Sequence, residues 1–274
     1  MRFRLFGILT FCGFLVFALT MTFVPVLPTW FNFAGRAGLL LIFGVLWLGA
    51  RDRQRLIGFR PVLFAYFTAV LGLSLGFFFG DPILGRFGLT TQTPAGIAVA
   101  KLSQASLIVI GVLAMAKLCG ENLASLYLRA GRLMLGLGVG LLGAAACLAL
   151  ALQQPAVSAL GTARLLSLTP WVLLFVASNG FMEELLFRGL FLGRYESLVG
   201  KWPAILSTAL AFTLAHMRVS YAPDMVVFLV VLFGLSIAWG WLIQKTGSLW
   251  GSVLFHAGAD LLIILPIFSS FGAA

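Results

Sequence analysis

Five titratable residues in the last third of the chain have the types and spacing for acid–base chemistry. They are Glu183, Glu184, His216, His256 and Asp260. All five lie in apolar stretches, where ionisable side chains are rare and are functional-site candidates by default. A buried carboxyl group and a buried imidazole can exchange protons near neutral pH, which general acid–base catalysis requires.

Two kinds of chemistry fit this set. Glu183 could deprotonate a water molecule that His216 helps to hold, while His256 and Asp260 support the oxyanion of a tetrahedral intermediate. Alternatively, two histidines and a carboxylate, here Glu183, His216 and His256, could hold Zn²⁺. The sequence has no H-E-x-x-H and no G-x-S-x-G motif, so direct attack of water on an amide fits better than a covalent enzyme. The expected cofactor is either none or a divalent metal such as Zn²⁺.

The spacing of residues around Glu183 and Glu184 gives these two glutamates different expected roles. Glu184 and Arg188 are four residues apart and share a helical face, so Arg188 is the expected ion-pair partner that lets Glu184 sit at depth. Glu183 points about 100° away and is the glutamate available for chemistry. Ser178 and Asn179, a turn earlier, are expected to be helix-packing groups.

The histidines also have neighbours at helical spacing. His256 and Asp260 are four residues apart and can meet one partner together, with Asp260 orienting the imidazole. Phe212 and His216 have the same spacing, so Phe212 could wall or orient that ring. Glu184, Arg188 and Phe212 are therefore expected to support the site, and Glu183, His216, His256 and Asp260 to be catalytic.

The composition assigns the segments that carry these residues to a membrane. Hydrophobic residues make up 61% of the 274 residues and charged residues 9%, against about 45–50% and 25% in soluble domains. The net charge of +10 is concentrated in short loops beside apolar segments, as the positive-inside rule describes. It therefore does not indicate a nucleic-acid-binding protein.

About 20 apolar residues cross a bilayer as a helix. The sequence has nine such segments, at about 5–24, 33–50, 62–80, 97–118, 133–153, 168–191, 203–221, 225–244 and 248–269. The seventh ends near Arg218 and Tyr221, so eight spans is the alternative. We predict an all-α, polytopic transmembrane bundle of 8–9 helices with its N-terminus in the cytoplasm.

Depth in the membrane connects the candidate residues. Counted at about 1.5 Å per residue from the basic end of each span, Glu183 lies about 16 Å deep, His216 about 20 Å and His256 about 12 Å. The three spans were oriented from loop charges alone. Their agreement in depth predicts one shared site.

Three motifs in this order resemble the CPBP family of CAAX proteases and bacteriocin-processing enzymes, also called Abi proteins, which includes type II CAAX prenyl endopeptidases. Glu183-Glu184-Leu-Leu-Phe-Arg188 is similar to E-E-x-x-x-R, Phe212-Thr-Leu-Ala-His216 to F-x-x-x-H, and His256-Ala-Gly-Ala-Asp260 to H-x-x-x-(Asn/Asp). The likeness covers about residues 168–269. It divides the chain into motif-free N-terminal helices, 1–167, and a catalytic core, 168–274.

This resemblance implies an intramembrane endopeptidase that acts on a peptide or a membrane-anchored protein in a cell membrane, taken as a bacterial inner membrane. It implies that Glu183 and His216 activate water, while His256 and Asp260 support the oxyanion, by either a metal-free or a metal-dependent route. An ionised Asp260 cannot donate to an oxyanion as asparagine can, which favours a role in orienting His256. The alternatives are a proton-coupled transporter and an inactive immunity or binding protein.

Overall fold

The computed structural model describes residues 2–271, which contain helices and no strand. The longer helices are α1 (Arg2–Phe17), α2 (Thr29–Gly49), α3 (Arg60–Arg86), α4 (Pro94–Leu118), α5 (Leu133–Leu152), α7 (Thr162–Glu184), α9 (Lys201–Ala215), α10 (Met225–Thr246) and α11 (Trp250–Ser269). Short helical segments link them: η1 (Ala18–Thr22), η2 (Ile57–Phe59), η3 (Leu123–Leu126), α6 (Pro155–Ser158), η4 (Leu185–Gly189) and α8 (Leu192–Val199). The predicted all-α fold is confirmed.

Within residues 2–271, eight helical segments are long and apolar enough to cross a membrane. The predicted span at 203–221 is not among them. It corresponds to α9, whose 15 residues extend only about 22 Å, whereas the hydrocarbon layer is about 30 Å thick. By length, the alternative of eight spans therefore describes the chain. The side on which the N-terminus lies stays a prediction.

The chain divides into two compact units, each built from separate stretches of sequence. The first unit comprises Met1–Ser74, Ile110–Leu126 and Leu186–Trp241, and the second comprises Leu75–Val109, Tyr127–Leu185 and Leu242–Ala274. The division expected from the motifs, at residues 167 and 168, stays a prediction. Its outer ends, residue 1 and residues 272–274, lie outside the described part of the chain.

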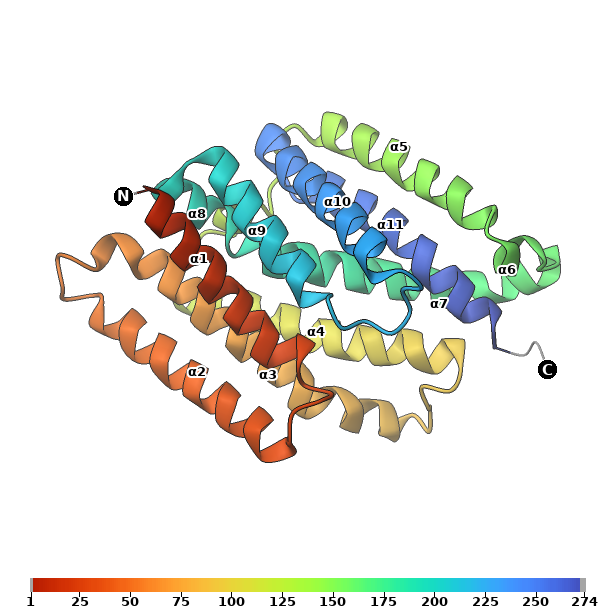
Figure 1. Ribbon diagram of the computed structural model, residues 1–274, viewed down its shortest axis with the longest axis horizontal. Coiled ribbons are helices and arrows are strands. Elements are labelled where there is room, and N and C mark those ends of the chain that lie inside the picture. The colour runs from red at the N-terminus through yellow and green to blue at the C-terminus, as the bar shows by residue number, and fades with distance from the viewer. Residues whose placement is uncertain (1, 272–274) are drawn as a thin grey trace. The chain divides into compact units, whose positions relative to one another are not determined.

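In the first unit, α1 packs against α8 and α9, the two helices that follow η4 (Figure 1). A buried polar contact joins α1, α3 and α8. The hydroxyl oxygens of Tyr66 and Tyr195 are 2.7 Å apart, and each lies 3.0 Å from the carbonyl oxygen of Leu9. Polar groups buried in a membrane protein need such partners because lipid offers none.

In the second unit, α11 packs against both α5 and α7 (Figure 1). Small residues allow the close approach of α5 and α11. A Cβ on Gly140 would lie 2.5 Å from the carbonyl oxygen of Gly251, so neither helix could keep this separation with a larger residue there. Small residues commonly permit such close approach of helices in membrane proteins.

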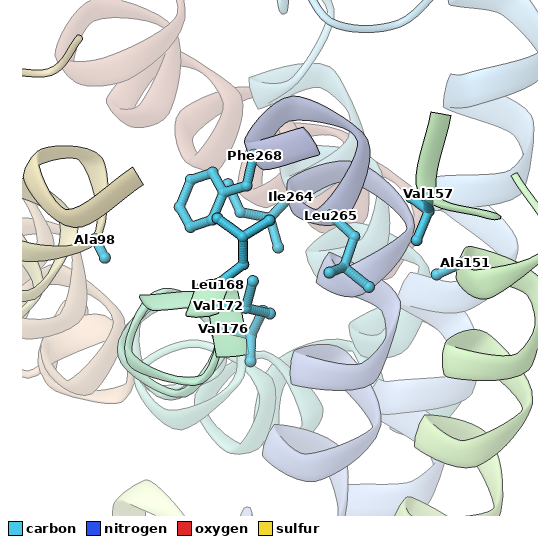
Figure 2. Close-up of a cluster of buried hydrophobic side chains, with 9 residues drawn as sticks. All are labelled: Ala98, Ala151, Val157, Leu168, Val172, Val176, Ile264, Leu265 and Phe268. Atoms are coloured by element: carbon cyan, nitrogen blue, oxygen red, sulfur yellow. The ribbon is translucent and has the colours of Figure 1, made fainter. Parts of the chain in front are cut away.

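An apolar cluster fills the second unit at the end of the α7–α11 pair where α7 begins and α11 ends. Its buried members on these helices are Leu168, Val172, Val176, Ile264, Leu265 and Phe268. Figure 2 shows that the side chains from α7 face those from α11, with Ala98 of α4 and Ala151 of α5 at the edges. This packing fixes the two helices against each other beside the polar residues farther along them.

Candidate active site

The polar residues lie where α7 and α11 run closest together. A Cβ on Gly180 would lie 3.1 Å from the backbone nitrogen of Ala257 and 3.3 Å from the carbonyl oxygen of Val253. These distances are tighter than ordinary van der Waals contact, so the missing side chain of glycine permits this spacing. As a result, side chains on both flanks of Gly180 reach α11 directly.

His256 is the centre of the contacts between the two helices. Its Nδ1 lies 2.8 Å from Oε1 of Glu184, and its Nε2 lies 3.4 Å from Oε2 of Glu183. Nε2 also lies 3.7 Å from Oδ1 of Asp260, one turn farther along α11. The residue His256 is 2% exposed. One buried imidazole therefore faces three carboxyl groups, an arrangement suited to holding and transferring protons.

Glu184 fixes the orientation of that imidazole. A carboxylate only accepts hydrogen bonds, so His256 Nδ1–H donates to Oε1 of Glu184. The other oxygen, Oε2, accepts a hydrogen bond of 2.5 Å from Oγ of Ser252. Glu184 is fully buried. Because both of its oxygens are engaged, the glutamate can hold the ring in one orientation, as carboxylates commonly do for functional histidines.

Asp260 connects His256 to a second residue of α7. Oδ2 of Asp260 accepts a 3.0 Å hydrogen bond from Nδ2 of Asn179, while Oδ1 faces His256. Asn179 is therefore part of the polar contacts. From the sequence, it was expected to be a helix-packing group. Oγ of its neighbour Ser178 donates to the carbonyl oxygens of Leu174 and Phe175 in its own helix.

Three of the predicted residues belong to the first unit and contact one another there. Nη2 of Arg188 donates to Oγ of Ser236 over 2.6 Å, and its guanidinium lies 4.5 Å from the ring centroid of Phe212. Arg188 is fully buried. The carbonyl oxygen of Phe212 accepts a 2.9 Å hydrogen bond from Nδ1 of His216.

The contact with Phe212 defines the orientation of His216. Their ring centroids are 4.6 Å apart with the planes tilted by 42°, and the ring follows the last residue of α9. With the proton on Nδ1, a neutral imidazole presents Nε2 as its acceptor. The expected place of His216 beside Glu183 and the expected pairing of Glu184 with Arg188 both stay predictions.

His, Cys, Asp and Glu are the side chains that could hold a metal ion. Among residues 2–271, no group of three His, Cys, Asp or Glu side chains is arranged to hold a metal ion. In the second unit, the nitrogens of His256 instead face carboxylate oxygens. These contacts do not fit a Zn²⁺ site as they stand, so no chemical step is assigned to a metal.

From the sequence, Ser252 was not singled out, and Asn179 and Glu184 were expected in other roles. Ser252 could have been found, because Ser252, His256 and Asp260 follow one another at intervals of four residues and share a face of α11. Asn179 stands four residues before Glu183 on α7, but its partner is on another helix. The orienting role of Glu184 was hidden for the same reason.

Residues 165–262 match the family model described as type II CAAX prenyl endopeptidase Rce1-like. The matched region contains Glu183, His216, His256 and Asp260. No curated protein and no solved structure matches the chain.

Proposed function

Because residues 165–262 match the Rce1-like family model, we propose that the chain is an intramembrane endopeptidase in which Glu183 activates the attacking water. The observation that carries this proposal is the pairing of Glu183 Oε2 with His256 Nε2 at 3.4 Å, in residues that are 4% and 2% exposed. Burial keeps bulk water away and strengthens every electrostatic interaction at the reacting bond.

The reaction is a hydrolysis in two stages. Glu183 removes a proton from water while the water oxygen attacks the carbonyl carbon of the scissile amide. The carbonyl oxygen becomes an oxyanion, which His256, protonated on both ring nitrogens, stabilises by donating a hydrogen bond from Nε2. The tetrahedral intermediate then collapses, the C–N bond breaks, and Glu183 returns the proton to the departing amine. His216 is the proposed second group that holds the water.

Glu184, Ser252 and Asp260 are proposed to act through His256. Glu184 holds Nδ1 at 2.8 Å, which keeps the ring turned toward the water and the substrate. Asp260 Oδ1, at 3.7 Å from Nε2, supports an orienting role for this carboxylate because an ionised oxygen cannot donate to an oxyanion. The residues therefore have separate roles in activating water and in positioning the imidazole.

The family description suggests the substrate. We propose a membrane-anchored peptide with a C-a-a-X end, in which the cysteine carries a prenyl group. A lipid-anchored tail would be held at the membrane whose spans carry the proposed site. The Zn²⁺ alternative, with Glu183, His216 and His256 as ligands, is tested by measuring cleavage before and after treatment of the enzyme with a chelator.

The function is tested with purified chain in liposomes and an internally quenched peptide that ends in a farnesylated C-a-a-X sequence. Glu183→Gln should lower kcat about 10²- to 10⁴-fold, the usual contribution of a positioned acid–base group, without lowering the melting temperature. Ser178→Ala on the same helix is the matched control and should keep wild-type kcat. A Glu183→Gln enzyme within tenfold of wild type would contradict the proposal. Proton-dependent flux lost in this variant would instead indicate a transporter.

A further inference from the structure

Lys101 places an ammonium group inside a membrane-spanning helix. The proposed reaction does not use this group. Lys101 lies seven residues after Pro94 in α4, about 10 Å along the helix. Its Nζ lies 5.6 Å from the ring centroid of Phe175 on α7 and 3.5 Å from Oε1 of Gln104. A lysine at this depth is costly and is a candidate functional group.

Asn179 provides a second, independent sign of a ligand. A carboxylate cannot donate, so the amide directs Nδ2 toward Asp260 and Oδ1 the other way. Among the described residues, Oδ1 of Asn179 has no hydrogen-bond partner, although the residue is only 7% exposed. Leaving a buried acceptor unpaired is energetically costly. A ligand N–H at this oxygen would remove that cost.

These two groups are aligned with the proposed general base. Phe175, Asn179 and Glu183 follow one another at intervals of four residues, so they share a face of α7. From Phe175, beside the Lys101 ammonium, to Glu183 is eight residues, or about 12 Å of helix. Three residues of extended peptide span about 10–11 Å. A short tail could therefore reach from the scissile bond to Lys101.

We propose that Lys101 binds the free C-terminal carboxylate of the substrate, and that Asn179 Oδ1 accepts a backbone N–H of the tail between that carboxylate and the scissile bond. The inference rests on the proposed endopeptidase function and adds to it the two residues that would recognise the end of the substrate tail. A carboxylate brought to this depth needs a cationic partner, because an unpaired charge is strongly disfavoured in a medium of low polarity.

A purely structural role for Lys101 makes a different prediction. Lys101 could instead serve only to stabilise the fold through its contacts with Phe175 and Gln104. In that case its loss would impair every substrate equally. Binding of the terminal carboxylate instead makes the effect depend on the end group of the peptide.

The experiment compares two peptides that differ only at the C-terminus, one a free acid and the other a primary amide, each with a farnesylated cysteine and three further residues. Wild-type enzyme should show a kcat/KM about 10- to 100-fold higher for the acid, mainly through KM, as expected for one charge-assisted contact. In Lys101→Met this preference should fall below about threefold. Lys117→Met, near the end of the same helix, is the control and should keep the preference.

Two further substrates test the length of the tail. Acid and amide peptides with six residues after the cysteine should be cleaved with similar kcat/KM, since their carboxylate lies beyond Lys101. Asn179→Ala should raise KM for both three-residue peptides. Equal cleavage of acid and amide by wild type, or an equal loss on both in Lys101→Met, would overturn the inference while the proposed function stands.

Binding separates this inference from the chemistry. Fluorescence anisotropy of the dansyl-labelled acid and amide peptides can be measured on Glu183→Gln, which binds without needing to cleave. Tighter binding of the acid, lost on adding Lys101→Met, supports the carboxylate site even if no peptide is cleaved. Equal binding of both peptides rejects the site, whereas absence of cleavage by wild type rejects the proposed function.

Discussion

The two halves of the α7–α11 pair differ in what they place between the same two helices. The half with Val172, Val176 and Phe268 is apolar and buried (Figure 2), whereas the half with Glu183 and His256 carries ionisable groups that are just as buried. The apolar half gains packing energy, while the polar half must satisfy each charge and hydrogen-bonding group. Stability and chemistry are therefore separated along one helix pair, and substitutions in the two halves should have different effects.

The largest effect on chemistry is expected from His256→Ala. Removing the imidazole takes away the proposed oxyanion donor and the partner of Glu183 Oε2 at 3.4 Å, so kcat should fall about 10²- to 10⁴-fold. The measurement is cleavage of the farnesylated peptide together with thermal unfolding in detergent. A melting temperature that falls as far as in the core variant below would show that the two halves are not separated.

The largest effect on stability is expected from Phe268→Ala in the apolar half. This ring is fully buried, and its removal should lower the free energy of unfolding by about 3–5 kcal/mol. Activity per folded molecule should stay within threefold of wild type. Leu173→Ala on α7 is the control, because Leu173 is 57% exposed and should change stability little. A kcat loss comparable to that of His256→Ala would remove the distinction.

An intermediate effect is expected from Glu184→Gln. An amide cannot accept from both His256 Nδ1 and Ser252 Oγ through two oxygens, so the orientation of the ring is loosened. Loss of such an orienting partner typically costs about 10- to 100-fold. The fall should appear in kcat, with KM nearly constant. An unchanged kcat would assign Glu184 a structural role only.

The smallest effect is expected from Ser252→Ala, which removes one hydrogen bond to Glu184 and leaves the other in place. The kcat should fall about threefold to tenfold, in line with a net contribution of about 1 kcal/mol or slightly more. In the double variant with Glu184→Gln, the second substitution should add little, because both act on the same carboxyl group. Full additivity in this double-mutant cycle would show that Ser252 acts elsewhere.

The sequence predicted those features that depend on residues within a single helix. Composition and length predicted the all-α membrane fold, and intervals of four residues placed Asp260 on the same face as His256. The length argument failed only for α9, whose apolar stretch continues past the helix that ends at Ala215. A span read from hydropathy does not reveal where its helical hydrogen bonding stops.

The contacts between helices could not be read in this way. In the sequence, Arg188 stands four residues after Glu184. The contacts of Glu184 with His256 and Ser252, however, depend on the relative register of α7 and α11. Asn179 and Asp260 depend on the same register. Lys101 stands alone in an apolar span, so no spacing drew attention to it. Register is a tertiary property that a single sequence does not encode in any local pattern.

The antiparallel course of α7 and α11 has a consequence for how this site can be assembled or lost. Ser252 contacts Glu184 near one end of the polar half of the α7–α11 pair, and Asp260 contacts Asn179 near its other end. A shift of α11 along α7 by one helical turn, about 5.4 Å, would separate both pairs. It would leave their ionisable groups unpaired in an apolar environment. The two hydrogen-bonded pairs therefore specify a single register of α7 against α11.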